Sequence, residues 1–194
     1  MEIKEKEVFG YEGKEGFDDI IAQMEAVNVI ACDTENSGTI RSADLWSGQH
    51  YLTGISTAWR SGSLASAYFP IRHEDNNIPK EWIPALRSVL ERKRIIFHNA
   101  KFDIAALSTL GFRIVIPPYD TAVMAHMCNE EFPSKKLEWL ARFILKDGKD
   151  KDRVYKYAKI FGWANVDAHL MAPYARKDAE LPYRLWEIFM KELA

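Results

Sequence analysis

The sequence predicts a layered α/β or α+β protein built around a single sheet. Two patterns support this class: short apolar runs typical of strands dominate the first half of the chain, and segments with helical spacing dominate the second half. The size agrees with it, since 194 residues, 47% of them hydrophobic, suit one domain with a substantial core. We therefore expect residues 1–194 to form a single domain, with no room for a second large one.

The N-terminal half is expected to supply most of the strands. Residues 1–14 are charged and interrupted by glycine, which predicts a loose lead-in. Apolar residues at helical spacing predict one helix over 17–26 and another over about 80–91. The remaining expected elements are strands at 27–32, 51–59, 64–70 and 94–98, a turn at 60–63 and a Ser/Gly-rich loop at 36–49.

The C-terminal half is expected to be mainly helical. A helix is predicted over 101–110, followed by a fifth short strand at 114–116 that Pro117-Pro118 would stop. From Asp120 to Leu193 the pattern is helical, with breaks predicted at 130–134, Gly148, Gly162 and Pro173. No internal repeat or low-complexity tract interrupts this plan.

Composition excludes several classes of protein. A net charge of −2 argues against a generally basic coat for nucleic acid. Cys32 and Cys128 lack CxxC spacing and are expected to be buried, reduced thiols of an intracellular protein. The N-terminus has no apolar core of a signal peptide, and no apolar stretch approaches ~18 residues. We therefore expect no contact with a membrane and a location in the cytosol of a cell or of an infected cell.

Asp33 and Glu35 are the first candidate ligands for a metal ion. They follow a mostly apolar run that predicts a buried strand, and residues two apart on a strand point to the same face. Acidic groups at a buried position are costly unless they are paired or bind a cation. A lone D-x-E is common, however, and the pair by itself is more often a solvated pair in a loop just beyond a strand end.

Asp103, Asp178 and Tyr174 are candidates from two other regions. Asp103 lies five residues after the strand predicted at 94–98, at the start of a helix, where an acid is also favoured by the helix dipole. Tyr174 and Asp178 are four residues apart in a helical pattern and therefore share a face. Such a tyrosine is usually part of a core, but beside an acidic cluster its hydroxyl can orient a water molecule.

These segments resemble the three exonuclease motifs of the DEDD superfamily, in its tyrosine subclass (DEDDy). Asp33-Thr34-Glu35 matches the first motif, Asn99-x-Lys101-Phe102-Asp103 the second and Tyr174-x-x-x-Asp178 the third. The likeness covers roughly residues 27–190. Within it, Tyr119-Asp120-Thr121-Ala122 resembles the D-T segment of the family, and residues 136–141 resemble the L-x-x-L-A helix that follows that segment. The sister subclass has histidine where this chain has Pro173. The whole is most similar to the proofreading domain of family A (DNA polymerase I-type) DNA polymerases, particularly those of phages.

The resemblance implies a fold, a cofactor and a role for each acid. The fold would be RNase H-like (DnaQ-like), with a mixed central sheet of about five strands flanked by helices. Two divalent cations, Mg²⁺ or Mn²⁺, would be held by Asp33, Glu35, Asp103 and Asp178, as suits ligands that are all oxygen. Asp33 would bridge both cations, Glu35 and Asp178 would complete the site of the attacking water, and Asp103 would serve the second cation largely through waters. Tyr174, with Glu35, would orient the nucleophile.

Contacts with the substrate are less specific in the sequence. Asn36 (where many members have threonine), Asn99 and Lys101 are candidates, and Phe102 would either stack on a base or pack in the core. The large apolar residue that often meets the terminal base is not evident in Ser37-Gly38-Thr39-Ile40.

A basic stretch late in the chain is a further candidate for strand binding. Residues 135–159 contain nine basic and four acidic residues, which suits either a solvated helix face or a guide for a phosphate backbone. The aromatic residues near it would form a single-strand platform or a helix core; they are Tyr155, Tyr157, Phe161 and Trp163.

The leading hypothesis is a metal-dependent 3′–5′ exonuclease that releases nucleoside 5′-monophosphates from the 3′ end of single-stranded DNA. It would be freestanding or the proofreading part of a polymerase whose synthetic half is a separate chain. Two alternatives stay open: an RNA-trimming 3′–5′ exoribonuclease of the same subclass, because no residue reveals readout of the 2′-OH, and a catalytically silent module that binds nucleic acid.

Overall fold

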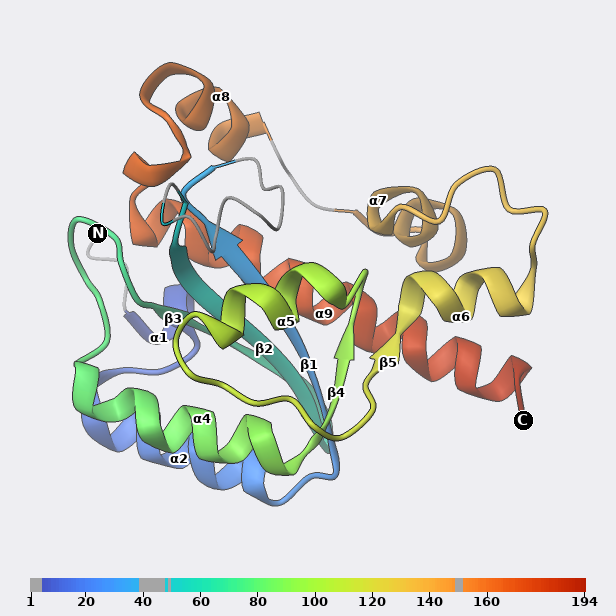
Figure 1. The fold of residues 1–194 in the computed structure, drawn as a ribbon, viewed down its shortest axis with the longest axis horizontal. Coiled ribbons are helices and arrows are strands. Elements are labelled where there is room, and N and C mark those ends of the chain that lie inside the picture. Colours follow the sequence, from blue (N-terminus) through green and yellow to red (C-terminus); the bar gives the residue numbers. More distant parts are fainter. Residues whose placement is uncertain (1–4, 39–47, 49, 149–151) are drawn as a thin grey trace.

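A five-stranded mixed sheet lies at the centre of the molecule (Figure 1). The computed structural model describes residues 5–38, 48, 50–148 and 152–194. The strands are β1 (Val29–Asn36), β2 (Leu52–Ser61), β3 (Ser63–Pro70), β4 (Arg94–Phe97) and β5 (Tyr119–Asp120), in the order β3-β2-β1-β4-β5. Antiparallel pairing joins β1, β2 and β3, whereas β4 is parallel to both β1 and β5. The predicted mixed sheet is confirmed.

β1 is the central strand because its first half is apolar on both faces. Ile30, Ala31 and Cys32 are fully buried. The strand continues to Asn36, past the predicted end at residue 32, because pairing with β2 extends over the acidic residues. Asp33 and Glu35 are therefore part of the sheet rather than of a loop beyond it.

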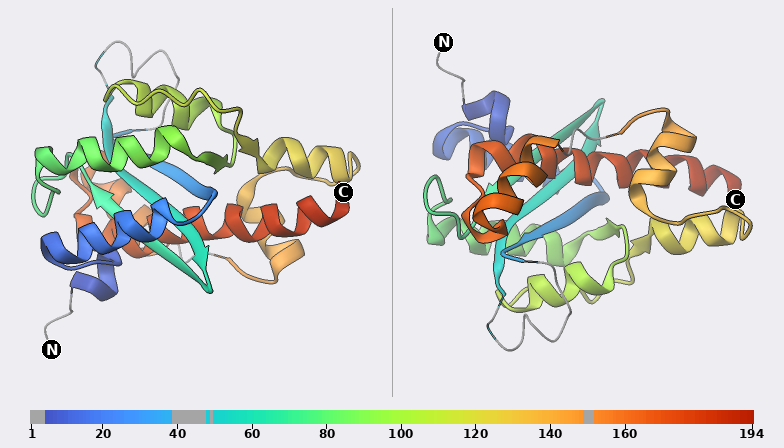
Figure 2. Two further views of the ribbon diagram at one scale, coloured as in Figure 1. Left: turned by 90° about the horizontal axis from the view of Figure 1, so that it is seen from below. Right: turned by 90° about the horizontal axis from the view of Figure 1, so that it is seen from above.

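Helices cover both faces of the sheet (Figure 2). α2 (Gly13–Glu25) and α4 (Ile83–Arg92) pack side by side on one face, and α9 (Ala168–Glu192) crosses the other face and contacts four strands. The other helical elements are α1 (Glu5–Phe9), η1 (Lys80–Trp82), α5 (Lys101–Ser108), α6 (Thr121–Cys128), α7 (Leu137–Leu140), the π-helical η2 (Ala141–Leu145), α8 (Asp152–Phe161) and η3 (Trp163–Asn165). The breaks predicted at 130–134, Gly148 and Gly162 are confirmed.

The break predicted at Pro173 is wrong. α9 runs through both Pro173 and Pro182. A proline inside a helix costs one backbone hydrogen bond and some strain, about 3 kcal/mol. The helix persists because its apolar face packs along the sheet and because the Asp167 carboxylate caps its start, accepting from the amides of His169 and Leu170. Tertiary packing here outweighs a local signal.

Two further expectations are corrected. Residues 5–14 are not a loose lead-in, because α1 buries Val8 and Phe9 and the Tyr11 ring stacks on Phe69 at 5.5 Å; residues 1–4 lie outside the described part of the chain. No strand forms at 114–116, where Val115 is 76% exposed. The pairing with β4 is instead made by β5, which follows the two prolines, since proline lacks the amide that a paired strand needs.

The state of the cysteines and the character of the helices bear on the expected environment. Both cysteines are free, and Cys32 is buried as expected, but Cys128 is only half-buried. Within the ranges given above, no helix is both long and apolar enough to cross a bilayer.

Residues 39–47 and 49 of the predicted 36–49 loop, including Thr39 and Ile40, lie outside the described residues.

Asp147 ties the segment after η2 to α9. Its carboxylate accepts a hydrogen bond from Lys177 Nζ at 2.7 Å and a second from Arg184, and all three side chains are half-buried. The bond from Lys177, followed by that from Arg184, lowers the pKa of Asp147 to about 2. Because α9 also carries Asp178, this ion pair helps to fix the register of the helix.

Asp147 should therefore make stability depend on acid pH. A pKa that is lower in the folded chain than in the unfolded chain stabilises the fold above the unfolded pKa, and the effect is lost as the pH falls through the folded pKa of about 2. Asp147→Asn should lower the free energy of unfolding by ~1–2 kcal/mol at neutral pH, after discounting for partial exposure. Urea titrations should show this difference shrinking below about pH 4. A difference that stays constant down to about pH 3 would contradict the ion pair.

Candidate metal-binding active site

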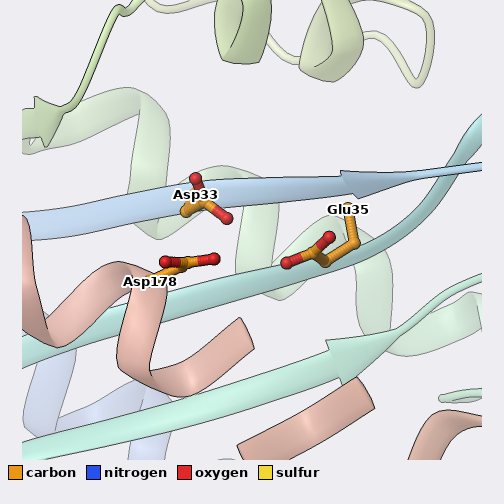
Figure 3. Close-up of side chains that lie close together, drawn as sticks. All are labelled: Asp33, Glu35 and Asp178. Atoms are coloured by element: carbon orange, nitrogen blue, oxygen red, sulfur yellow. The ribbon is translucent and has the colours of Figure 1, made fainter. Parts of the chain in front are cut away.

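Three carboxylates from two distant segments meet between β1 and α9 (Figure 3). Asp33 and Glu35 project from the same face of β1, as their spacing predicts, and Asp178 approaches from α9. One oxygen of each carboxylate lies within 4.8 Å of the others. Glu35 and Asp178 are 9% and 5% exposed, so the cluster is sheltered from water.

Small residues let α9 come close enough to β1 for this meeting. Ala179 of α9 is fully buried against Ala31 of β1 and Ala58 of β2. Without longer side chains between them, the helix and the strands pack closely. Asp178, adjacent to Ala179 in the helix, is thereby brought up to the two acids of β1.

The cluster has the chemistry of a site for a hard divalent cation. Three carboxylates, two of them buried and Asp33 half-buried, repel one another, and their oxygen donors suit Mg²⁺ or Mn²⁺ rather than a softer metal. The neighbouring Cys32 does not change this donor set. Burial, followed by the charges of Asp103 and Asp33, raises the pKa of the Cys32 thiol well above its usual range, so it stays protonated.

Asp103 lies beside the cluster but is not part of it. Its Oδ1 accepts hydrogen bonds from Thr34 N at 2.9 Å and from Thr34 Oγ1 at 2.8 Å. Burial raises the pKa of Asp103 to about 7, although the bonds from Thr34 lower it. The structure therefore brings together three of the four predicted ligands and anchors the fourth on the residue between Asp33 and Glu35.

Asp120 holds the turn that carries Asp103. Asn99 has a positive φ of 69°, and the amides of Asn99 and Ala100 donate to the two oxygens of Asp120 at 3.0 and 2.9 Å. Asp120 also caps α6, accepting from Ala122 N at 2.9 Å. The hydroxyl of Thr121 donates to the Phe97 carbonyl at 3.1 Å. Hydrogen bonds of Asp120 and Thr121 thus join β4, α5 and α6 to one another. The sequence pointed to these two residues by resemblance alone.

Tyr174 lies one helical turn before Asp178 and is 9% exposed. Burial, followed by the charges of Asp178 and Glu35, raises the pKa of its hydroxyl far above the usual value, so Tyr174 stays protonated at neutral pH. The hydroxyl also hydrogen-bonds with that of Tyr155 in α8. Tyr174 therefore presents a protonated hydroxyl group close to the carboxylates.

A cavity of about 780 Å³ opens beside the cluster. Its lining includes three of the four residues expected to contact substrate, namely Asn36, Asn99 and Phe102. Lys101 is not in the lining: it is exposed, with its ammonium group 5.0 Å from the Phe102 ring centre. The lining residues to which the sequence analysis gave no role are Thr34, Gly38 and His98; the position of His98 at the end of a buried strand, directly before Asn99, is the signal that could have identified it.

The basic stretch at 135–159 is divided by the fold. Lys156 and Lys159 of α8 line the cavity, together with Tyr155 and with Trp163 of η3. The Tyr155 and Trp163 rings meet edge to face at 5.1 Å. Lys149 and Lys151 lie outside the described residues, and the remaining basic residues of the stretch, like Tyr157 and Phe161, are not in the cavity lining.

A second layer supports Glu35 from behind. Glu35 pairs with Gly54 of β2, and a Cβ at position 54 would lie 2.0 Å from the Tyr68 hydroxyl oxygen. Tyr68 is fully buried and hydrogen-bonds to His73 Nε2 at 2.7 Å, while His73 Nδ1 donates to the Val166 carbonyl at 2.7 Å. Since Nδ1 carries the hydrogen and burial lowers the pKa of His73, Nε2 accepts from Tyr68. The chain of bonds links β3 to the segment that precedes α9.

Comparisons with known proteins agree with this geometry. The sequence profile of a family described as 3′–5′ exonuclease matches residues 9–194. The chain is 29% identical to the DNA polymerase I of Borreliella burgdorferi (91% of this chain, 19% of that protein) and 28% identical to the DNA polymerase DpoZ of Salmonella phage PMBT28 (90% and 28%). It therefore spans less than a third of either relative. Escherichia coli RNase D, an exoribonuclease involved in structured RNA processing, has the same fold (TM-score 0.64, 16% identity, 94% of this chain and 44% of that one). The predicted RNase H-like fold is confirmed.

Gly54→Ala should disturb the support of Glu35. The added methyl group would overlap the Tyr68 ring, and overpacking of this kind costs ~1–3 kcal/mol. Gly16→Ala is the matched control, because its Cβ would lie 3.5 Å from its nearest neighbour in the interior of α2 and should stabilise the helix by ~0.5–1 kcal/mol. Urea titrations measure both changes, and a shift in the same direction for the two variants would contradict this account.

Proposed function

Because this chain belongs to the 3′–5′ exonuclease family found in DNA polymerases of the polymerase I type, we propose that it removes nucleotides from the 3′ end of single-stranded DNA. The observation that supports this most strongly is the meeting of Asp33, Glu35 and Asp178 within 4.8 Å beside a large cavity. We propose that residues 1–194 act as one exonuclease domain in the cytoplasm, of a host cell if a phage encodes it.

The three clustered acids would hold a divalent cation, Mg²⁺ or Mn²⁺, and Asp103 would help to hold a second through bound water. When bound, such cations lower the pKa of the attacking water and neutralise charge on the phosphate and on the departing 3′-oxygen. This role is consistent with the position of Asp103. Its carboxylate is held by hydrogen bonds from Thr34, the residue between the two acids of β1.

Glu35 and Tyr174 would orient the attacking water. The carboxylate of Glu35 accepts a hydrogen from the water, and the Tyr174 hydroxyl fixes its position, because a tyrosine whose pKa is raised this far keeps its own proton. Attack at phosphorus breaks the bond to the 3′-oxygen of the preceding nucleotide. The products are a nucleoside 5′-monophosphate and a strand shorter by one nucleotide.

The cavity offers both elements of a single-strand binding site. Lys156 and Lys159 supply positive charge for phosphates, and Tyr155, Trp163 and Phe102 supply ring faces or edges for bases. Asn36 would contact the terminal nucleotide: its buried Oδ1 has no hydrogen-bond partner among the described residues. Asn99 belongs to the same lining, and Lys101, which is exposed, would meet the backbone just outside the cavity.

RNA is the second candidate substrate. The likeness to RNase D, itself an exoribonuclease, extends over 94% of this chain but at 16% identity, which argues for the fold alone. Discrimination depends on whether a site donates to or excludes the 2′-OH. A silent binding module is disfavoured, because Asp33, Glu35, Asp103, Tyr174 and Asp178 are all present and all lie in or beside one site.

Asp33→Asn should abolish degradation of 5′-labelled single-stranded DNA in Mg²⁺ or Mn²⁺. Loss of a cation ligand removes several kcal/mol of transition-state stabilisation, so the rate should fall by more than about 10²-fold. Asp19→Asn, at an exposed position of α2, is the matched control and should retain full activity. Parallel digests of RNA and of DNA, resolved on gels, decide between the two substrates. Wild-type rates in Asp33→Asn would refute the site.

Tyr174→Phe should slow the enzyme without inactivating it. Only the hydroxyl that orients the water is lost, so kcat should fall by roughly 10²–10⁴-fold while the ring still fills the core. Single-turnover digestion of the labelled DNA measures the chemical step, and circular dichroism checks the fold. An unchanged rate would show that Tyr174 serves packing alone.

A further inference from the structure

Three aromatic rings form a cluster on α7, η2 and the segment before them, outside the cavity lining. Trp139 and Phe143 stack at 4.7 Å and an interplanar angle of 15°, and Phe132 meets Trp139 at 5.6 Å and Phe143 at 6.0 Å. Phe132 and Trp139 pack against a buried cluster that includes Phe189 of α9, whereas Phe143 is 52% exposed. Phe143 therefore presents an apolar surface that two other rings support from behind.

Basic side chains lie over the same rings. The ammonium group of Lys146 is 5.3 Å from the centre of the Phe143 ring, and that of Lys135 is 5.8 Å from the centre of the Phe132 ring. These lysines belong to the part of the basic stretch at 135–159 that does not line the cavity. The stretch thus contributes a second group of cations, and this group is combined with exposed aromatic surface.

The acidic side chains near this surface leave the charge of Lys146 in place. Glu138 pairs with Arg142 at 3.1 Å, and the carboxylate of Asp147 accepts from two basic residues of α9. Lys146 is exposed and forms no ion pair within the described part of the chain. Its ammonium group is therefore available to an anion in solution.

Lys146 also has a backbone conformation that is rare for a residue with a side chain. It ends η2 with φ 53° and ψ 32°, in the left-handed region that glycine and asparagine favour. Its amide donates to the Ala141 carbonyl at the end of the π-helical turn. A side chain in this region destabilises the fold relative to glycine. Such strain, like π-helical turns, concentrates at functional sites, which indicates that Lys146 serves something other than folding.

A single nucleic-acid strand is the partner that this surface fits. Exposed aromatic rings bind bases by stacking, and neighbouring ammonium groups bind phosphates. The surface is also well placed along the chain, because η2 directly precedes α8, which contributes to the cavity lining. Figure 1 shows α7 and α8 on the same upper side of the molecule.

We propose that Phe143 and Lys146 form a second contact for single-stranded DNA, which binds the strand upstream of the 3′ end that enters the cavity. Phe143 stacks on a base, and Lys146 pairs with a phosphate. This inference rests on the proposed exonuclease function and deepens it, because it assigns residues outside the cavity to the path of the substrate. The competing occupant is a second copy of this chain, since exposed apolar side chains also form protein interfaces.

Strand length separates this contact from the cavity. Fluorescence anisotropy in EDTA compares oligo(dT) of about four nucleotides, which occupies the cavity alone, with oligo(dT) of about 20 nucleotides. Phe143→Ala should weaken binding of the long strand by roughly five- to a hundredfold, the worth of one stacked base, and leave that of the short strand unchanged. Phe161→Ala is the matched control, because Phe161 is 54% exposed but packs on Tyr157, and it should bind both strands as wild type does.

Lys146→Gly should change stability and binding in opposite directions. Glycine relieves the left-handed backbone, so the melting temperature should rise by about 1–4 °C. Loss of one phosphate contact should reduce the salt dependence of binding to the long strand, lowering the slope of log Kd against log salt concentration by about 0.7. Lys80→Ala removes the same charge from η1, which precedes α4 on the opposite side of the sheet, and should leave the slope unchanged.

Several outcomes overturn the inference. They are an unchanged affinity of Phe143→Ala for the long strand, an equal loss in Phe161→Ala, and a lower melting temperature of Lys146→Gly. Sedimentation that shows a wild-type dimer and a monomer of Phe143→Ala would assign the surface to self-association instead. Digestion of the short strand in Mg²⁺ tests the proposed function separately and should proceed in all these variants. An inactive wild type would refute the exonuclease, while the anisotropy still decides whether the surface binds DNA.

Discussion

Mutual repulsion among three closely spaced carboxylates, two of them buried, is the constraint that the rest of this structure accommodates. At separations below 4.8 Å and an effective dielectric constant near 20, each pair of charges would repel by about 3–4 kcal/mol. Such a cluster persists only on a scaffold that holds its parts in place, and a divalent cation offsets the repulsion. The scaffold is provided by the packing of Ala179 on Ala31 and Ala58, which brings α9 against β1 and β2.

Two networks around the cluster set its finer geometry. On one side, Asp120 clamps the turn at Asn99 and Ala100 and thereby places Asp103 against Thr34. On the other side, Tyr68 occupies the space left by Gly54, and His73 links Tyr68 to the Val166 carbonyl just before α9. The first network joins α5, which carries Asp103, to β4 and α6, and the second joins β3 to the segment just before α9, so the geometry of the cluster depends on side chains outside it.

The fold also decides which of the basic residues face the site. Residues 135–159 form one positively charged stretch in the sequence, yet only part of it, in α8, reaches the cavity. Asp147, in the same stretch, is used internally to bind Lys177 and Arg184. Charge along the sequence therefore did not separate the residues that line the cavity from those that hold the domain together.

The sequence by itself determined the central strand, the pairing of Asp33 with Glu35 on one face, and the pairing of Tyr174 with Asp178 on one helix. These follow from short periodicities, two residues for a strand and about four for a helix. Packing decided the rest. Because of packing, α9 continues through Pro173, and residues 5–14 are ordered, with Tyr11 stacked on Phe69. The fifth strand forms after the two prolines, and Asp103 binds Thr34 outside the three-acid cluster. Local pattern cannot predict such outcomes, because each depends on the free energy of contacts between segments that are remote in the chain.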